Sequence, residues 1–106
     1  MRKEYYKLVR DRIPEIITKN GLNYEIVTLN ETEYRQALRQ KLIEEAGETA
    51  EANEQNLVTE LADLYEVIDA VMMSYGITRE LVILEQVKRR EDRGGFEERI
   101  MLLWTE

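Results

Sequence analysis

The sequence is expected to fold as an all-α protein: a helical bundle of three main helices, with a short N-terminal helix and minor β segments, completed by oligomerisation. The composition favours helices, because the 106 residues include one Pro and five Gly and many of the strongest helix formers. Three long stretches also place apolar residues at helical spacing between start and stop signals. The length is that of one domain, so we treat residues 1–106 as a single unit.

The ends of the chain are expected to hold the short helix and the minor β segments. In "DRIPEIITKNG", Asp11 is a candidate cap, Pro14 falls in the first turn, and Asn20-Gly21 is a stop signal. In segments on either side of this helix, apolar and polar residues alternate weakly and β-branched and aromatic side chains are common, which favours strands. The β segments are expected at residues 5–9 and 23–29, with a closing strand or docking segment at 98–106.

Three long helices are expected in the rest of the chain. Asn30 and Glu33 have the spacing of a capping box, and Thr78 can cap the last helix. The "NEQN" that follows the first helix, Gly76 after the second, and the Gly pair after the third are stop signals. These helices are expected over residues 31–52, 57–75 and 79–93.

The composition limits the chemistry that the chain can perform. There is no Cys and no His, so thiolate chemistry and a histidine general base are excluded. Any metal site must be built from oxygen ligands, which suits Mg²⁺, Mn²⁺ or Ca²⁺ rather than zinc, copper or a di-iron centre. The first residues do not resemble a signal peptide, and no apolar run approaches a membrane span. We therefore expect a soluble, cytoplasmic protein with no membrane partner.

The net charge of −7 is unevenly distributed. Residues 1–19 contain six basic and three acidic residues, whereas residues 25–69 contain three basic and twelve acidic ones. Residues 79–99 contain six of each. An acidic middle between basic ends is a poor footprint for nucleic acid, which requires a continuous basic face. The same distribution suits a site where a cation and an anionic substrate meet, although solvated helix charges would also produce it.

The acidic residues of "QKLIEEAGETAEA" do not fall on the polar face of their helix. Drawn at 100° per residue with Tyr34 at zero, the helix has an apolar arc around that residue. Glu45 falls at roughly 20° and Glu48 at roughly 320°, both inside the arc. Lys41 also falls inside it, and Glu44 lies at its edge. These acids are therefore expected to face the core.

The second long helix carries two acid pairs with the spacing i, i+3. With Leu57 at zero, Glu60 falls at roughly 300° and Asp63 at roughly 240°, beside the apolar arc. Glu66 and Asp69 lie on the far side, so we interpret them as surface charge. The apolar arc is formed by Leu61, Leu64, Ile68, Val71, Met72 and Tyr75.

Carboxylates on packed faces of two helices indicate a divalent cation. Each one costs several kcal/mol in a packed interior unless it is compensated, and a cluster of them is further destabilised by mutual repulsion. Mg²⁺ relieves both problems, and i, i+3 pairs on facing helices are an economical way to bind it. The alternative is that these acids form salt bridges to Lys41, Arg35, Arg39 or a partner subunit.

Several motifs resemble those of a known enzyme superfamily. "EEAGE" (Glu44, Glu45, Glu48) and "ELAD" (Glu60, Asp63) resemble the EExxE and ExxD signature of the all-α nucleotide pyrophosphohydrolases, which include MazG and the phosphoribosyl-ATP pyrophosphohydrolases. The segments "YKLVRDRIPEII" and "RGGFEERI" resemble small single-domain members, so the resemblance spans nearly the whole chain.

The resemblance implies a Mg²⁺-dependent enzyme that cleaves the bond between the α and β phosphates of a nucleoside triphosphate or a phosphoribosyl-ATP-like substrate. The products would be the monophosphate and pyrophosphate. It also implies a homodimer or homotetramer. The metal ligands would be Glu45, Glu48, Glu60 and Asp63. The catalytic acids would be Glu44, which orients the attacking water, and Glu45. The candidate phosphate-binding residues are Lys41, Lys88, Arg89 and Arg93.

Two other functions fit the same residues. The chain can be a non-catalytic, Mg²⁺-binding helical interaction module, or an acidic regulator that mimics nucleic acid. The regulator would display its acids on an exposed face, whereas these are expected to face inward. Arg10 and Arg12 in "VRDR" could assist the site, but pairing with the acidic middle is their more ordinary role.

Overall fold

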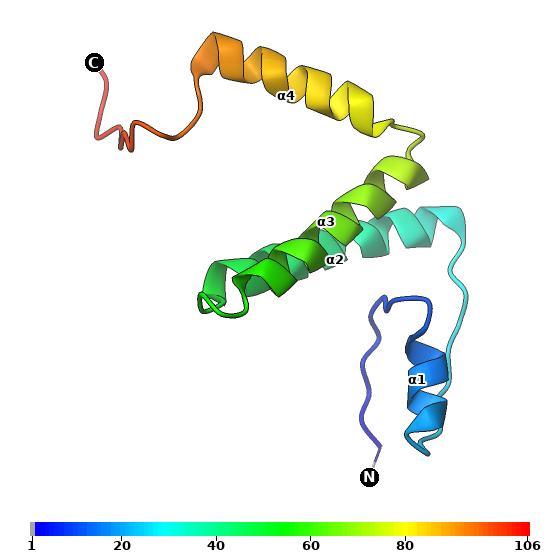
Figure 1. Ribbon diagram of the computed structural model, residues 1–106. Helices are drawn as coiled ribbons and strands as arrows, with labels where there is room; N and C mark the ends of the chain where they lie inside the picture. The colour runs from blue at the N-terminus through cyan, green and yellow to red at the C-terminus, as the bar shows by residue number, and fades with distance from the viewer. Residues whose placement is uncertain (1) are drawn as a thin grey trace.

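The computed structural model describes residues 2–106, and this part of the chain contains four helices and no strand (Figure 1). The helices are α1 (Ile13–Lys19), α2 (Glu31–Glu51), α3 (Leu57–Ser74) and α4 (Arg79–Arg93). The all-α fold class predicted from the sequence is therefore confirmed. No helix in residues 2–106 is long and apolar enough to cross a membrane.

Local sequence signals account for where the helices begin. At the start of α2, Asn30 Oδ1 accepts a hydrogen bond from the Glu33 amide at 2.8 Å, and Glu33 Oε1 accepts one from the Asn30 amide at 3.2 Å. This is the predicted capping box, which satisfies two otherwise unpaired backbone donors. Thr78 caps α4 through the Leu81 amide, as predicted. In contrast, the cap position of α1 is Arg12 rather than Asp11, and its side chain makes no capping hydrogen bond.

The helices α2 and α3 pack side by side as a hairpin (Figure 1). Residues 52–56 connect them, and the Asn56 amide donates to the Asn53 side chain at 3.0 Å, which tightens the turn. Leu38 of α2 is 2% exposed, and Val67 and Met72 of α3 are 8% and 9% exposed. These three side chains form the buried apolar core.

The open end of the hairpin is closed by two arginines of α2. The Arg35 guanidinium donates to the Ser74 carbonyl through Nε at 3.1 Å and lies 4.5 Å from the Tyr75 ring centroid. Arg39 Nε donates to the Tyr75 hydroxyl at 3.1 Å. A carbonyl at the end of α3 is thereby satisfied by a side chain, so the two helices are joined at both ends.

The face of α3 that packs on α2 overlaps the predicted arc but is shifted from it. Met72 of that arc is buried, and three further members are half-buried: Leu64, Ile68 and Val71. Leu57 and Leu61 are 37% and 40% exposed, whereas Val67, outside the arc, is buried. The shift brings the acid-bearing side of α3, with Glu60 and Asp63 partly buried, towards α2.

Outside the hairpin, the chain is extended. Figure 1 shows α1 and the N-terminal segment on one side of the hairpin, and α4 leading away on the other. The radius of gyration is 18.2 Å, compared with about 13 Å for a compact domain of this length. Apolar side chains of α4 and of the C-terminal tail are exposed, including Leu84 at 67%, Phe96 at 99% and Trp104 at 70%.

Two structural predictions need correction. The segments at residues 5–9, 23–29 and 98–106 form no strand, because none of them pairs with a neighbouring strand that could accept its backbone hydrogen bonds. The bundle predicted from three main helices consists, within one chain, of the packed pair α2 and α3.

Leu38 should be the side chain on which hairpin stability depends most. We expect Leu38→Ala to lower the free energy of unfolding by about 2–5 kcal/mol, because it removes apolar contacts and leaves a cavity. Leu38→Met conserves volume and should cost less than about 1.5 kcal/mol. Urea denaturation followed by far-UV circular dichroism measures both, and equal losses for the two variants would contradict the packing described.

Candidate metal centre

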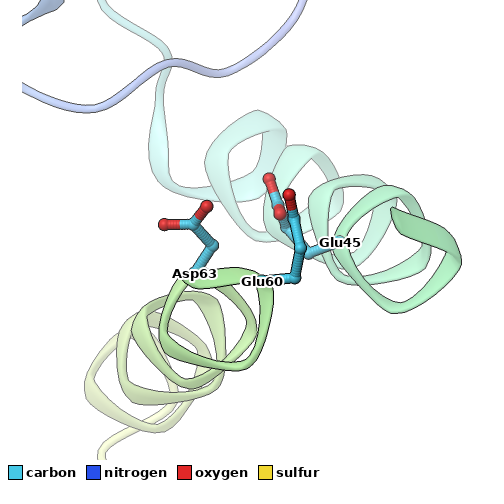
Figure 2. A group of neighbouring side chains, drawn as sticks. All are labelled: Glu45, Glu60 and Asp63. Carbon is cyan, nitrogen blue, oxygen red and sulfur yellow. The ribbon is translucent and has the colours of Figure 1, made fainter. Parts of the chain in front are cut away.

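Three carboxylates converge between α2 and α3. Glu45 comes from the middle of α2, and Glu60 and Asp63 come from the first two turns of α3. One oxygen of each lies within 4.8 Å of the others. Figure 2 shows the three side chains directed to the same side of the helix pair. The short turn between the helices brings these positions opposite each other.

The burial of this cluster is unusual for charged groups. Glu45 is 7% exposed, and buried carboxylates are rare unless they are paired. Both Glu45 Oε2 and Glu60 Oε2 are buried and have no hydrogen-bond partner. An unsatisfied buried polar atom costs about 1–3 kcal/mol. The hairpin therefore needs something that compensates these two oxygens.

A divalent cation with oxygen ligands fits this arrangement. One oxygen of each carboxylate lies within 4.8 Å of the other two, so small movements of these side chains would bring all three to the roughly 2.1 Å at which Mg²⁺ binds oxygen. All the donors are carboxylate oxygens, which suit Mg²⁺ and Mn²⁺. The unpartnered oxygens of Glu45 and Glu60 supply the lone pairs that such an ion requires.

The electrostatics of the cluster also favour a bound divalent cation. Burial raises the pKa of Glu45, and the neighbouring carboxylates of Glu48 and Asp63 raise it further, while Lys41 opposes the shift. A raised pKa means that the folded protein disfavours the charged form of Glu45. A bound divalent cation would reverse this preference, because it stabilises the ionised carboxylate.

Three basic residues surround the carboxylates. Lys7 Nζ lies 3.0 Å from Glu44 Oε1, and Arg10 Nη2 lies 2.6 Å from Asp63 Oδ1. Lys41 Nζ is 3.6 Å from oxygens of both Glu44 and Glu45. The hydrogen bond from Lys7 is the main cause that lowers the pKa of Glu44, and the same contact raises the pKa of Lys7.

The structure brings together some of the predicted site residues and separates others. Glu45, Glu60 and Asp63 form the cluster, with Glu44 and Lys41 beside it. Glu48 is exposed, contrary to its place on the helical wheel, whereas Ala37 and Lys41 at similar angles are half-buried. The structure does not bring three of the predicted phosphate-binding residues to the cluster within one chain. They are exposed on α4: Lys88, Arg89 and Arg93.

The remaining predicted ion pairs also differ from expectation. Arg35 pairs with Glu31 and the end of α3, and Arg39 contacts Tyr75, so neither arginine neutralises the cluster. Arg12 pairs with Glu15 within α1. The second acid pair of α3 is separate from the cluster, and its Asp69 binds Arg79 at 2.6 Å.

Sequence reasoning missed Lys7 as a neighbour of the site. Lys7 and its partner Glu44 are 37 residues apart, and no periodic pattern connects an extended segment with a helix at that distance. The available signal was the excess of basic residues at the N-terminus facing an acidic middle. This signal indicates attraction between the two regions but does not specify which residues meet.

Replacing Glu45 should show how much its unsatisfied carboxylate lowers the free energy of unfolding. In EDTA, we expect Glu45→Gln to raise the free energy of unfolding at neutral pH by about 1–3 kcal/mol, the cost of an unsatisfied buried group. The folded-state pKa of Glu45 is raised, so its penalty is absent below the unfolded pKa, near 4.5, and develops as pH rises through the folded value. The gain should therefore grow with increasing pH in urea titrations.

Added Mg²⁺ should reverse the order of stability of the wild type and Glu45→Gln. Wild-type protein should gain thermal stability with Mg²⁺, because the ion binds the folded state, while Glu45→Gln should gain little. Glu51→Gln, at the exposed end of α2, is the matched control and should respond like the wild type. A wild-type melting temperature that does not change between EDTA and millimolar Mg²⁺ would contradict a metal centre here.

Comparisons with known proteins add no further constraint. No protein-family model matches the chain, and no match was found among curated proteins or solved structures. The motif resemblance therefore remains an expectation, and the function must be argued from the geometry of the carboxylate cluster.

Proposed function

We propose that this chain is a Mg²⁺-dependent nucleotide pyrophosphohydrolase, related to the all-α nucleotide pyrophosphohydrolases. It would hydrolyse the α–β phosphoanhydride of a nucleoside triphosphate or a phosphoribosyl-ATP-like substrate to the monophosphate and pyrophosphate. The observation that carries the proposal is the convergence of Glu45, Glu60 and Asp63 around two buried carboxylate oxygens without partners. Mn²⁺ is expected to substitute for Mg²⁺.

The residues of the cluster divide into two roles under this proposal. Glu45, Glu60 and Asp63 would hold the cation from two facing helices, and Glu48, one turn along α2, is close enough to influence Glu45 and would be a fourth ligand. The lowered pKa of Glu44 keeps it ionised. It can therefore accept a hydrogen bond from the attacking water and orient it.

This chemistry needs no nucleophilic side chain, which agrees with a sequence lacking Cys and His. A bound Mg²⁺ would neutralise phosphate charge and activate water for attack. The protein would supply the cation's ligands, the orientation of the water and positive charge for the leaving pyrophosphate. Lys41 is suited to the last task, because it lies beside the cluster and contacts both Glu44 and Glu45.

We also propose that the fold is completed by a homodimer or homotetramer. One chain exposes 10,230 Å², whereas a compact protein of 12.6 kDa exposes about 6,200 Å². Much of the excess is apolar, on the outer stripe of α3, on α4 and on the tail. A second copy is the partner that a symmetric assembly would supply. It would also shelter a nucleotide that one hairpin leaves open to solvent.

The alternative is a non-catalytic Mg²⁺-binding interaction module. The ion pairs that Lys7, Arg10 and Lys41 form with the acids favour it, because they partly neutralise the cluster without a reaction. They contact Glu44, Asp63 and one oxygen of Glu45, however, and leave Glu45 Oε2 and Glu60 Oε2 without partners. A bound cation would account for these two oxygens under either proposal, so the activity assay below distinguishes the two.

An activity assay tests the reaction class. We expect a panel of ordinary and modified nucleoside triphosphates, with phosphoribosyl-ATP included, to yield monophosphate and pyrophosphate from at least one substrate in Mg²⁺. EDTA should abolish turnover. Glu60→Gln should reduce kcat at least about 100-fold, because it removes a metal ligand. Quantifying both products distinguishes this reaction from removal of a single phosphate.

The matched control for this assay is Glu66→Gln, an exposed glutamate on the same helix. It should retain wild-type turnover. Folded, Mg²⁺-binding protein that hydrolyses nothing in the panel would favour the interaction module. Turnover that survives Glu60→Gln would place the reaction elsewhere in the chain.

Light scattering at micromolar concentration tests the assembly. We expect a mass of two or four chains. Leu61→Lys, on the apolar stripe of α3, should shift the protein towards the monomer, because it puts a charge into the buried contact. Ala62→Lys adds the same charge on a neighbouring, exposed position and should have less effect. A wild-type monomer at this concentration would refute the proposed assembly.

A further inference from the structure

The N-terminal segment, residues 5–12, brings two cations to the acidic cluster. Lys7 donates to Glu44 at 3.0 Å, and Arg10 donates to Asp63 at 2.6 Å. In Figure 2 the N-terminal ribbon passes on the side towards which the carboxylates point. The segment is therefore joined to this side of the cluster by two ion pairs.

Arg10 and a divalent cation would bind the same carboxylate. Asp63 is one of the three converging acids, and Arg10 is its hydrogen-bond partner. Neither Arg10 nor Lys7 reaches the unpartnered oxygens of Glu45 and Glu60. The two cations thus occupy the rim of the cluster and leave its centre to another positive charge.

The contacts of the N-terminal segment are weak enough to exchange. The Lys7 side chain is 45% exposed and that of Arg10 is 56% exposed, and exposed ion pairs contribute little to stability. Residues 5–9 belong to no helix or strand. A groove of about 470 Å³ lies between this segment and α2, and Lys7 and Lys41 both line it. This groove therefore places Lys7 and Lys41 together beside Glu44.

Building on the proposed function, we propose that Lys7 and Arg10 are phosphate-binding residues of this site. Without metal they pair with Glu44 and Asp63. A divalent cation at the cluster displaces Arg10 from Asp63, and both side chains then bind the phosphate oxygens of a polyphosphate. Arg suits this task because its planar guanidinium binds two phosphate oxygens at once. The N-terminal segment thereby supplies the charge that α4 does not bring to the cluster.

This role predicts opposite effects of one substitution. If Arg10 competes with the metal, Arg10→Gln strengthens metal binding, because the competing charge is lost. If Arg10 also binds phosphate, the same substitution weakens polyphosphate binding. If the ion pair were purely structural, its loss would loosen the cluster. Metal binding and polyphosphate binding would then both weaken. Lys7→Gln, whose partner lies beside the cluster, should mainly weaken polyphosphate binding.

The experiment measures two affinities in the full chain. Electron paramagnetic resonance follows Mn²⁺ binding without nucleotide, and calorimetry follows inorganic pyrophosphate binding in saturating Mg²⁺. We expect Arg10→Gln to bind Mn²⁺ about two- to fivefold more tightly and pyrophosphate about tenfold more weakly. Arg12→Gln is the matched control, because Arg12 pairs with Glu15 within α1, and it should change neither affinity.

The outcomes separate this inference from the function on which it rests. Mn²⁺ affinity that falls or stays constant in Arg10→Gln would overturn the competition. Pyrophosphate affinity that is unchanged in both Arg10→Gln and Lys7→Gln would overturn the phosphate-binding role while leaving the metal centre intact. Wild-type protein that binds no Mn²⁺ would overturn the metal centre and this inference together.

Discussion

The burial of Glu45 and Glu60 between α2 and α3 constrains the rest of the structure. Their unpartnered oxygens lie in the contact that holds the only closely packed pair of helices in residues 2–106. A hairpin selected for stability alone would centre the apolar arc of α3 on α2. In this hairpin the contact is shifted towards the acids, so that Glu45 is buried while Leu57 and Leu61 are 37% and 40% exposed. The local loss of stability is explained if the acids are needed for binding a cation.

The same orientation of α3 explains why the outside of the hairpin is apolar. Because the acid-bearing side of α3 packs on α2, residues such as Val58 and Tyr65, which are 78% and 66% exposed, face outwards. The proposed metal site and the exposed apolar surface that a partner would cover therefore both follow from one packing face. A second copy that covers the stripe would add the apolar burial that the small core lacks, and would hold the acids in position.

Features that depend on residues close together in the sequence could be predicted from it, whereas contacts between distant residues could not. The capping box of Asn30 and the cap of Thr78 are formed by residues three apart, and the helices begin where predicted. The buried face of α3 depends instead on which neighbour packs against it, and a wheel drawn for one helix contains no such information. A wheel of α2 placed Glu45 correctly, because the arc is centred near this residue, but it also placed Glu48 inside the arc, and Glu48 is exposed. Pairing between Lys7 and Glu44 lies beyond any local pattern.

The formal charges around the cluster can be counted, and the count includes two cations of the N-terminal segment. Five carboxylates (Glu44, Glu45, Glu48, Glu60 and Asp63) lie near three cations (Lys7, Arg10 and Lys41). The formal excess of two negative charges equals the charge of one divalent cation. That balance includes Lys7 and Arg10, so one bound divalent cation would leave the whole group of acids and bases formally neutral. Under the proposed function, an arriving polyphosphate would then meet a neutral group in place of a negative one. If the proposed function holds, this charge balance favours a metal ion that binds before the anionic substrate or together with it.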